Sequence, residues 1–162
     1  MTTSADATPF SEQDWTDLER LIEDRLAVAS GLLGIAVIEV DTSELETAVQ
    51  RLVDHLDAED LTARTDHDRF VIVRSPLTGP AEMEGLGLRI ADSFPATPSA
   101  PSADDPIERS TVHVGVVTGR RGDTARTLLR HAQFGLEDAK AIGRAMVVVD
   151  DGPRLLVDEA GV

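Results

Sequence analysis

The chain has 162 residues, 41% of them apolar, which is enough to bury the core of one globular domain. It has no cysteine, which excludes disulfides, thiolate metal sites and cysteine nucleophiles, and its polar N-terminus lacks the features of a signal peptide. Its net charge of −15 disfavours nucleic acid and anionic membranes as partners, and no apolar run could cross a bilayer, so we expect a cytoplasmic protein.

The first half of the chain predicts two helices, a buried strand and a hairpin. Residues 11–29 carry apolar side chains at helical spacing behind a candidate N-cap, Ser11, and residues 35–40 are a short β-branched run typical of a buried strand. Apolar side chains at helical spacing over residues 45–56 predict the second helix. Residues 61–64 and 70–74 predict two strands, joined by a polar tip in which Asp66-His67 serves as the turn pair because both residue types tolerate positive φ.

The second half predicts helices over 80–94 and 123–142 and strands over 111–117 and 146–149, with a short edge strand at 155–157. A Pro-, Ser- and Ala-rich segment, 95–106, predicts a mobile loop. A hairpin inside alternating helices and strands predicts an α+β fold with a mixed central sheet of about five strands flanked by helices. We expect one domain over 11–157, a flexible segment over 1–10 and a tail over 158–162.

Three segments, in this order, resemble the GGDEF family of diguanylate cyclases. IAVIEVDTSEL (35–45) is similar to the family's first strand, which ends in Asp-x-Asp. DLTARTDHDRFVIV (60–73) is similar to the hairpin with the signature Asp-x-x-x-Arg-x-Gly-Gly-Asp/Glu-Glu-Phe, and LLRHAQFGLEDAKAIGRAMVVV (128–149) to the last helix and strand, with Ala-Lys-x-x-Gly-Arg. The resemblance covers nearly all of residues 11–149 and implies the nucleotide-cyclase architecture, a ferredoxin-like palm.

The resemblance also implies the remains of a metal site. The family joins two GTP molecules with the help of two divalent cations, for which carboxylates are the natural ligands. Glu39 stands where the family has the first Asp of its strand, Asp41 at the second Asp, and Asp68 at the third signature position. Two interpretations remain open: these acids bind Mg²⁺ weakly, or they only cap the end of the strand.

The signature itself departs from the family pattern at three of its last five positions. Asp66 and His67 replace the Gly-Gly pair, whose backbone a phosphate approaches closely in the family, and side chains there would obstruct that approach. Arg69 replaces the Glu of the fourth position and reverses its charge, whereas Phe70 is kept. The hairpin is therefore expected not to support catalysis.

Two further family features are absent from the stretch between the first strand and the hairpin. The resemblance implies roughly a dozen more residues between Asp41 and Arg64, including the Asn and Asp that read the guanine edge, and a site without them loses base specificity. Asp57 and Asp60 stand at the positions of the family's inhibitory Arg-x-x-Asp, where two carboxylates cannot bind a phosphate as Arg does. We expect neither cyclic di-GMP synthesis nor product feedback.

Two cations match the family's phosphate-binding pair. Lys140, the only lysine of the chain, matches the Lys of the Ala-Lys-x-x-Gly-Arg run, and Arg144 matches its Arg. Two interpretations stand side by side: the pair contacts phosphates, or it completes a helix C-terminus, where cations are favoured.

These features predict a catalytically inactive GGDEF-like domain that acts through an unknown protein partner in trans and requires no cofactor, with homodimerisation left open. The alternative is a residual nucleotide-binding or weakly NTP-hydrolysing domain that uses Glu39, Asp68, Lys140 and Arg144. An active cyclase is disfavoured by the missing segment. We also expect the hairpin tip beside the end of the strand 35–40, with Glu39 and Asp68 facing one cleft, Arg69 turned away, and a weak cation site rather than a buried salt bridge.

Overall fold

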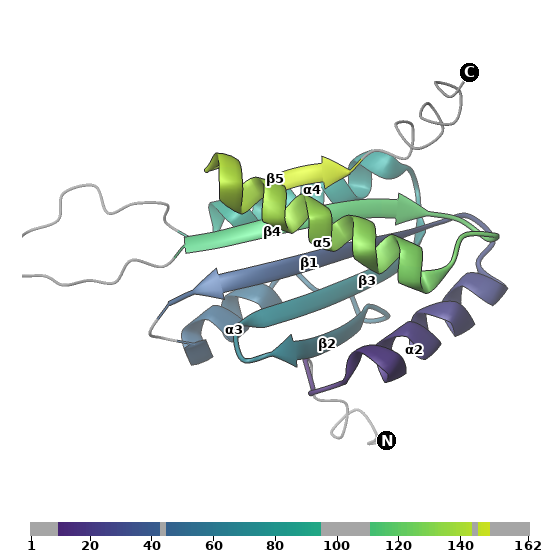
Figure 1. Cartoon of the computed structure of the whole chain (residues 1–162), viewed down its shortest axis with the longest axis horizontal. Coiled ribbons are helices and arrows are strands. Elements are labelled where there is room, and N and C mark those ends of the chain that lie inside the picture. Colours follow the sequence, from purple (N-terminus) through teal and green to yellow (C-terminus); the bar gives the residue numbers. More distant parts are fainter. Residues whose placement is uncertain (1–9, 43–44, 95–110, 144–145, 150–162) are drawn as a thin grey trace, which may run out of the picture.

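The computed structural model describes residues 10–42, 45–94, 111–143 and 146–149, and the rest of the chain lies outside it. Its strands form one sheet in the order β2-β3-β1-β4-β5 (Figure 1). Their bounds are β1 Leu32–Asp41, β2 Leu61–Asp66, β3 Arg69–Leu77, β4 Thr111–Gly119 and β5 Met146–Val149. The helices are α2 Trp15–Val28, α3 Leu45–Val53, α4 Pro80–Asp92 and α5 Ala125–Ile142.

The sheet is mixed, which confirms the predicted fold class. Its central strand β1 pairs antiparallel with β3 on one side and β4 on the other, whereas β5 pairs parallel with β4. The apolar run in β1 fits this central place, because a strand covered on both faces needs apolar side chains in both directions. Within β1, acidic side chains occur only at its end, at Glu39 and Asp41.

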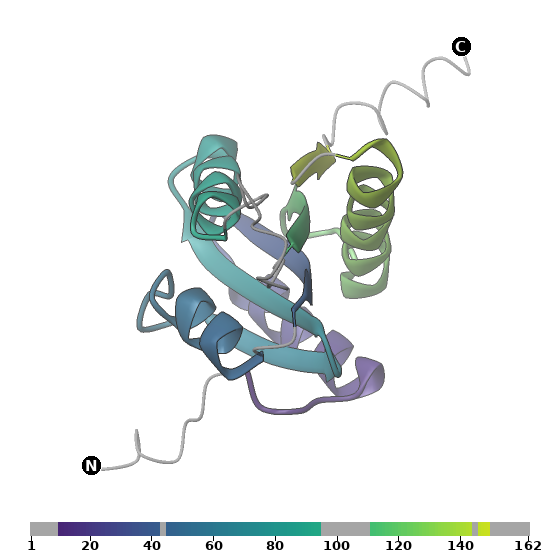
Figure 2. The same cartoon turned by 90° about the vertical axis from the view of Figure 1, so that its left-hand side faces the viewer.

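Helices cover both faces of the sheet, α2 and α5 on one and α3 and α4 on the other (Figure 2). Alternate side chains of β1 divide between the two cores, since successive strand residues point to opposite faces. Ala36 and Ile38 pack in the core of α3 and α4, and Ile35 and Val37 pack in the core of α2 and α5. The odd-numbered residues of β1, Glu39 among them, therefore lie on the α5 side.

Helix α5 lies unusually close to β4, and a glycine makes this approach feasible. A Cβ atom at Gly115 would collide with the backbone of α5 at the Ala132 carbonyl and the Leu136 amide. The helix then continues to Ile142 and ends at Gly143, whose φ of 76° is the left-handed conformation common at helix C-termini. This packing carries the last turns of α5, and with them Lys140, over the end of β1.

The N-terminal boundary differs from the prediction. Helix α2 begins at Trp15 rather than Ser11, because Asp14 is the N-cap and its carboxylate accepts the backbone N–H of Asp17 at 2.8 Å. Phe10 is buried, with 5% of its surface exposed, so the flexible segment predicted for residues 1–10 extends too far. Residues 10–13 instead lie along β2.

The hairpin turn is displaced by one residue from the predicted pair. Asp66 is still the last residue of β2, opposite Arg69, so the turn consists of His67 and Asp68. The register shifts between Arg64 and Asp66, a β-bulge that moves the turn forward. In the described part of the chain the one non-glycine residue with positive φ is Phe10, so the positive φ expected at Asp66-His67 is wrong.

Several predictions fall outside the described residues, namely the mobile loop 95–106, the edge strand 155–157 and the tail 158–162. The bounds of the single domain, 11–157, stay a prediction. Among the described helices, none has both the length and the apolar character needed to span a bilayer.

Candidate functional site

Glu39 lies near the end of the central strand, between charged or polar neighbours on both sides. The β1–β3 register places Arg69 directly across from it, and the β1–β4 register places His113 on its other side. Directly opposite residues share a face of the sheet. The last turns of α5 pass over the same face, so Glu39 is surrounded by side chains from three other elements, β3, β4 and α5.

Two cations contact the Glu39 carboxylate. Arg69 donates from Nη2 to Oε1 at 2.7 Å, and Lys140 Nζ lies 3.0 Å from Oε2 and 3.2 Å from Oε1. Glu137 of α5 is the second acid, 3.5 Å from Arg69 and 3.8 Å from Lys140. We call Glu39, Arg69, Glu137 and Lys140 the Glu39 cluster. Its two acids and two bases balance in charge.

The electrostatics of the Glu39 cluster favour an ionised Glu39. Its side chain is 18% exposed and that of Arg69 is 22% exposed, so both charges are largely removed from water. Burial, the largest single influence, would raise the pKa of Glu39, but the hydrogen bonds from Arg69 and Lys140 and the attraction of their positive charges together hold that pKa below its ordinary value. The carboxylate is thus charged at neutral pH and already has its counter-ions.

The sequence predicts a weak cation site rather than a buried salt bridge, and the ion pair between Glu39 and Arg69 corrects the second part of that expectation. The weak cation site itself stays a prediction. The pairing of β3 with β1 places Arg69 opposite Glu39, and the two side chains form the ion pair. The prediction considered the strand alone and not its register. Glu137 was missed, although its position three residues before Lys140 on a helix places the two on one face.

The hairpin tip lies where the resemblance placed it, beside the end of β1. The backbone N–H of Val40 donates to the Asp68 carbonyl at 3.0 Å. Asp66 and His67 are exposed, Asp68 is half-buried, and Phe70 is fully buried. Because the register pairs Glu39 with Arg69, Asp68 is not the residue opposite Glu39.

The other family positions have separate surroundings. Asp41 is exposed at the last residue of β1, opposite Thr111. Arg144 lies outside the described residues, so the structure brings only Lys140 of the predicted phosphate pair to the Glu39 cluster. Within the described segments, no three histidine or acidic side chains gather closely enough to hold a metal ion.

Asp60 is engaged inside the protein. Its carboxylate accepts two hydrogen bonds from the Arg74 guanidinium, at 2.9 Å from Nε and 2.8 Å from Nη2, and only 2% of its side chain is exposed. Arg74 also donates to the His55 carbonyl at 3.1 Å, and Asp57 lies 3.5 Å away, with 68% of its side chain exposed. The hydrogen bonds that Arg74 donates to Asp60 raise the pKa of Arg74, so its guanidinium remains charged.

Solved structures with this fold come from GGDEF proteins. A truncated form of TpbB (also named YfiN) from Pseudomonas aeruginosa, which contains only the GGDEF domain, matches with a TM-score of 0.69 and 20% identity over 90% of this chain and 95% of that one. The active GGEEF domain of a diguanylate cyclase from Vibrio cholerae matches with a TM-score of 0.66 and 15% identity over 88% of this chain and 98% of that one.

A longer protein also matches, the diguanylate cyclase SiaD of Pseudomonas aeruginosa in complex with its activator SiaC. The TM-score is 0.62 and the identity 21%, over 83% of this chain and 55% of that one. No curated protein matches the chain in sequence. The family model described as "Diguanylate cyclase, GGDEF domain" matches residues 41–146, which is more than half of the chain. The chain therefore belongs to the GGDEF domain family.

Proposed function

We propose that this chain is a non-catalytic GGDEF domain that acts through protein contacts and does not synthesise cyclic di-GMP. The observation that carries the proposal is the Glu39 cluster. The carboxylate that corresponds to a family metal ligand already has two counter-ions, Arg69 at 2.7 Å and Lys140 at 3.0 Å. A divalent cation would have to displace a largely buried arginine, so the residues present do not fit a catalytic Mg²⁺.

Lys140 supports the proposal as well. In the family this lysine contacts phosphate, whereas here its ammonium lies between the carboxylates of Glu39 and Glu137. A triphosphate that reached this place would have to compete with both acids for one cation and would meet their negative charge. The contacts that neutralise Glu39 thus make Lys140 unavailable to a phosphate group.

The segment between β1 and the hairpin supports the loss of guanine recognition. Strand β1 ends at Asp41 and α3 begins at Leu45, so the connection is too short to hold the family's base-reading segment. Polar groups that pair with a base supply most of the discrimination in such sites. We infer that guanine recognition is lost together with that segment.

Feedback by cyclic di-GMP is also disfavoured. Asp60, which corresponds to the acid of the inhibitory motif, accepts two hydrogen bonds from Arg74 and one from the backbone N–H of Asp57, and its side chain is almost completely buried. Asp57 stands where the motif has Arg, and a carboxylate repels phosphate. Through Arg74 of β3, which also lies 3.9 Å from Glu82 of α4, Asp60 links the α3–β2 connection to both of these elements.

A regulatory role through a protein partner remains for such a domain. SiaD, whose structure matches this fold, was solved in complex with its activator SiaC, which makes a protein partner plausible for a domain of this fold. We propose that the present chain acts in the same general way, in trans, with no required cofactor.

Isothermal titration of the purified chain with GTP, ATP and cyclic di-GMP in the presence of Mg²⁺ tests the proposal. We expect no saturable heat with any of the three ligands, while the active GGEEF domain of Vibrio cholerae, as positive control, should bind GTP. Saturable binding of GTP or ATP would instead support the residual nucleotide-binding alternative. The variant Lys140→Met would then tell whether the Glu39 cluster is the site, because such binding should weaken when its ammonium is removed.

A further inference from the structure

Phe10 lies in the core beside the signature hairpin although it precedes the first helix. Its ring meets the ring of Phe70 edge-to-face, with the centroids 5.3 Å apart and the planes at 86°. It reaches this place with a φ of 60°, the left-handed conformation that a bulky side chain seldom adopts. A strained backbone at a buried aromatic residue indicates that the surrounding contacts hold it there.

The three residues after Phe10 follow the edge strand of the sheet. The backbone N–H of Arg64 donates to the Ser11 carbonyl at 3.0 Å, and Gln13 donates to the Arg64 carbonyl at 3.2 Å. The Phe10 N–H donates to Thr62 Oγ1 at 2.8 Å. We call residues Phe10–Gln13 the strap. It covers part of the β2 edge, whose backbone groups would otherwise be open to another strand.

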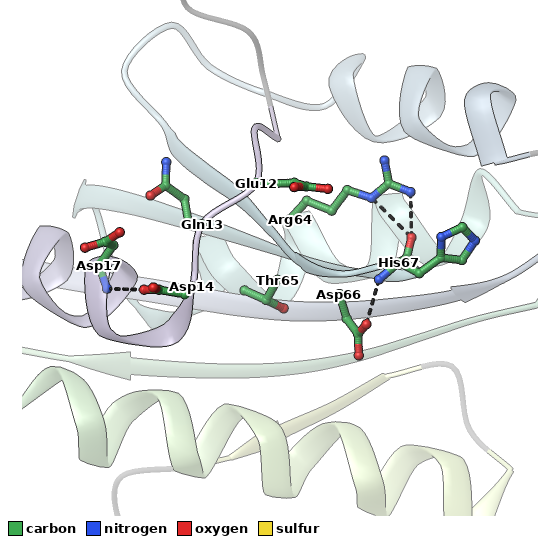
Figure 3. Close-up of a pocket in the computed structure, with 8 residues that line it drawn as sticks. All are labelled: Glu12, Gln13, Asp14, Asp17, Arg64, Thr65, Asp66 and His67. Atoms are coloured by element: carbon green, nitrogen blue, oxygen red, sulfur yellow. Dashed lines mark hydrogen bonds between the residues drawn. The ribbon is translucent and has the colours of Figure 1, made fainter.

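Arg64 connects the strap to the hairpin turn. Its backbone pairs with the strap, and its guanidinium lies over the Phe70 ring, 5.3 Å from the centroid. The same guanidinium donates to the His67 carbonyl from Nε at 3.1 Å and from Nη2 at 2.6 Å (Figure 3). One residue thus contacts the strap, the buried aromatic ring and the turn at the same time.

Only a few contacts hold the strap against the rest of the domain. Ser11 and Glu12 are exposed, and the outer side of the strap borders an open cavity of about 560 Å³ between the start of α2 and the hairpin (Figure 3). Two inter-strand hydrogen bonds, one side-chain bond and one ring hold it, and release would relieve the left-handed backbone of Phe10. Segments with few buried contacts open locally at lower cost than the core.

We propose that the strap can detach from the β2 edge, and that the signature hairpin is well ordered while the strap is bound and less ordered when it is detached. While it is bound, Arg64 is held between Phe70 and the His67 carbonyl, and the turn stays against the end of β1. When it leaves, the β2 edge opens to an extended segment of a protein partner, and the turn loses its contact with the fixed Arg64. A partner that captures the chain at Phe10 would act on the hairpin without contacting it. This inference holds whether or not the chain binds nucleotide.

Amide hydrogen exchange of the whole chain, read residue by residue by NMR, tests the strap. The variant Phe10→Ala removes the ring, and Gln13→Pro removes one inter-strand hydrogen bond without touching the core, which keeps the test informative if the first variant folds poorly. Phe134→Ala, at an aromatic residue that is 57% exposed on α5, is the matched control. The decisive reporter is the Val40 amide, which bonds to the turn at Asp68 and not to the strap.

In both strap variants the exchange of the Arg64 and Val40 amides should rise by about tenfold or more, while the amides of Val37 and Val116 in the centre of the sheet keep their protection. The control variant should leave all four amides unchanged. Faster exchange at the Arg64 amide alone would mean that the strap only covers the strand edge and does not affect the turn, which would overturn the proposal. A uniform rise across the sheet, or no change at all, would overturn it equally.

Discussion

The ion pair between Glu39 and Arg69 should contribute to folding, and a double-mutant cycle with Glu39→Gln and Arg69→Met isolates that contribution. The two charged groups are 2.7 Å apart and about four-fifths buried. Hydrogen bonds to charged groups contribute about 1.5–3 kcal/mol, and exposed ion pairs about 0.2–1 kcal/mol. Because Lys140 stays next to Glu39 when Arg69 is removed, we expect a coupling energy near the lower end of the first range, about 1.5 kcal/mol.

Urea denaturation at pH 7 and moderate salt measures the free energy of unfolding of the wild type, the two single variants and the double variant. The exposed pair Arg20–Asp17, at 3.4 Å on the surface of α2, provides a matched control cycle in the same protein. We expect its coupling energy to stay below about 0.5 kcal/mol. A Glu39–Arg69 coupling no larger than that of the control pair would mean that the Glu39 cluster is not an internal counter-ion site.

Three further predictions concern acid stability, the buried arginine and the product. The pKa of Glu39 is lower in the folded state than its ordinary value of about 4.3. The ionised carboxylate therefore stabilises the fold above that ordinary value, and this stabilisation is lost as the pH falls through the folded-state pKa. Urea midpoints measured at pH 5 and at pH 3 should show that the wild type loses more stability than Glu39→Gln. Arg74→Met leaves the almost buried Asp60 without its guanidinium and should lower the unfolding free energy by about 3–5 kcal/mol in urea, whereas a loss below about 1 kcal/mol would contradict the structural role. Cyclic di-GMP should not raise the melting temperature, although a true ligand at a hundred times its Kd would add about 2.7 kcal/mol of stability and give a clear shift.

The sheet and its helices could be predicted because their patterns are local. The apolar run of β1 and the spacing of apolar residues in α5 identify the elements without tertiary information. The position of the hairpin turn beside the end of β1 was predicted from the resemblance, and the hydrogen bond from the Val40 N–H to the Asp68 carbonyl confirms it. The bulge after Arg64 has no equally clear signal in the sequence, and it displaced the turn by one residue.

The contacts of the site could not be predicted in the same way, because they depend on register. Arg69 faces Glu39 only through the pairing of β1 with β3, and Glu137 reaches Arg69 only because α5 packs close to β4. Phe10 was missed for a related reason. Ser11 and Asp14 are both good N-cap residues, and the burial of an aromatic side chain ahead of them, not their own propensity, decides between the two.

The most direct test of the central claim is a cyclase assay on the purified chain. The protein is incubated with GTP and Mg²⁺ or Mn²⁺, and the products are separated by chromatography, with the active GGEEF domain of Vibrio cholerae as positive control. With Arg69 and Lys140 both bound to Glu39, and without a segment to read guanine, the chain should give no cyclic di-GMP under conditions in which the control does. Clear turnover of GTP to cyclic di-GMP by this chain would contradict the proposed loss of catalysis.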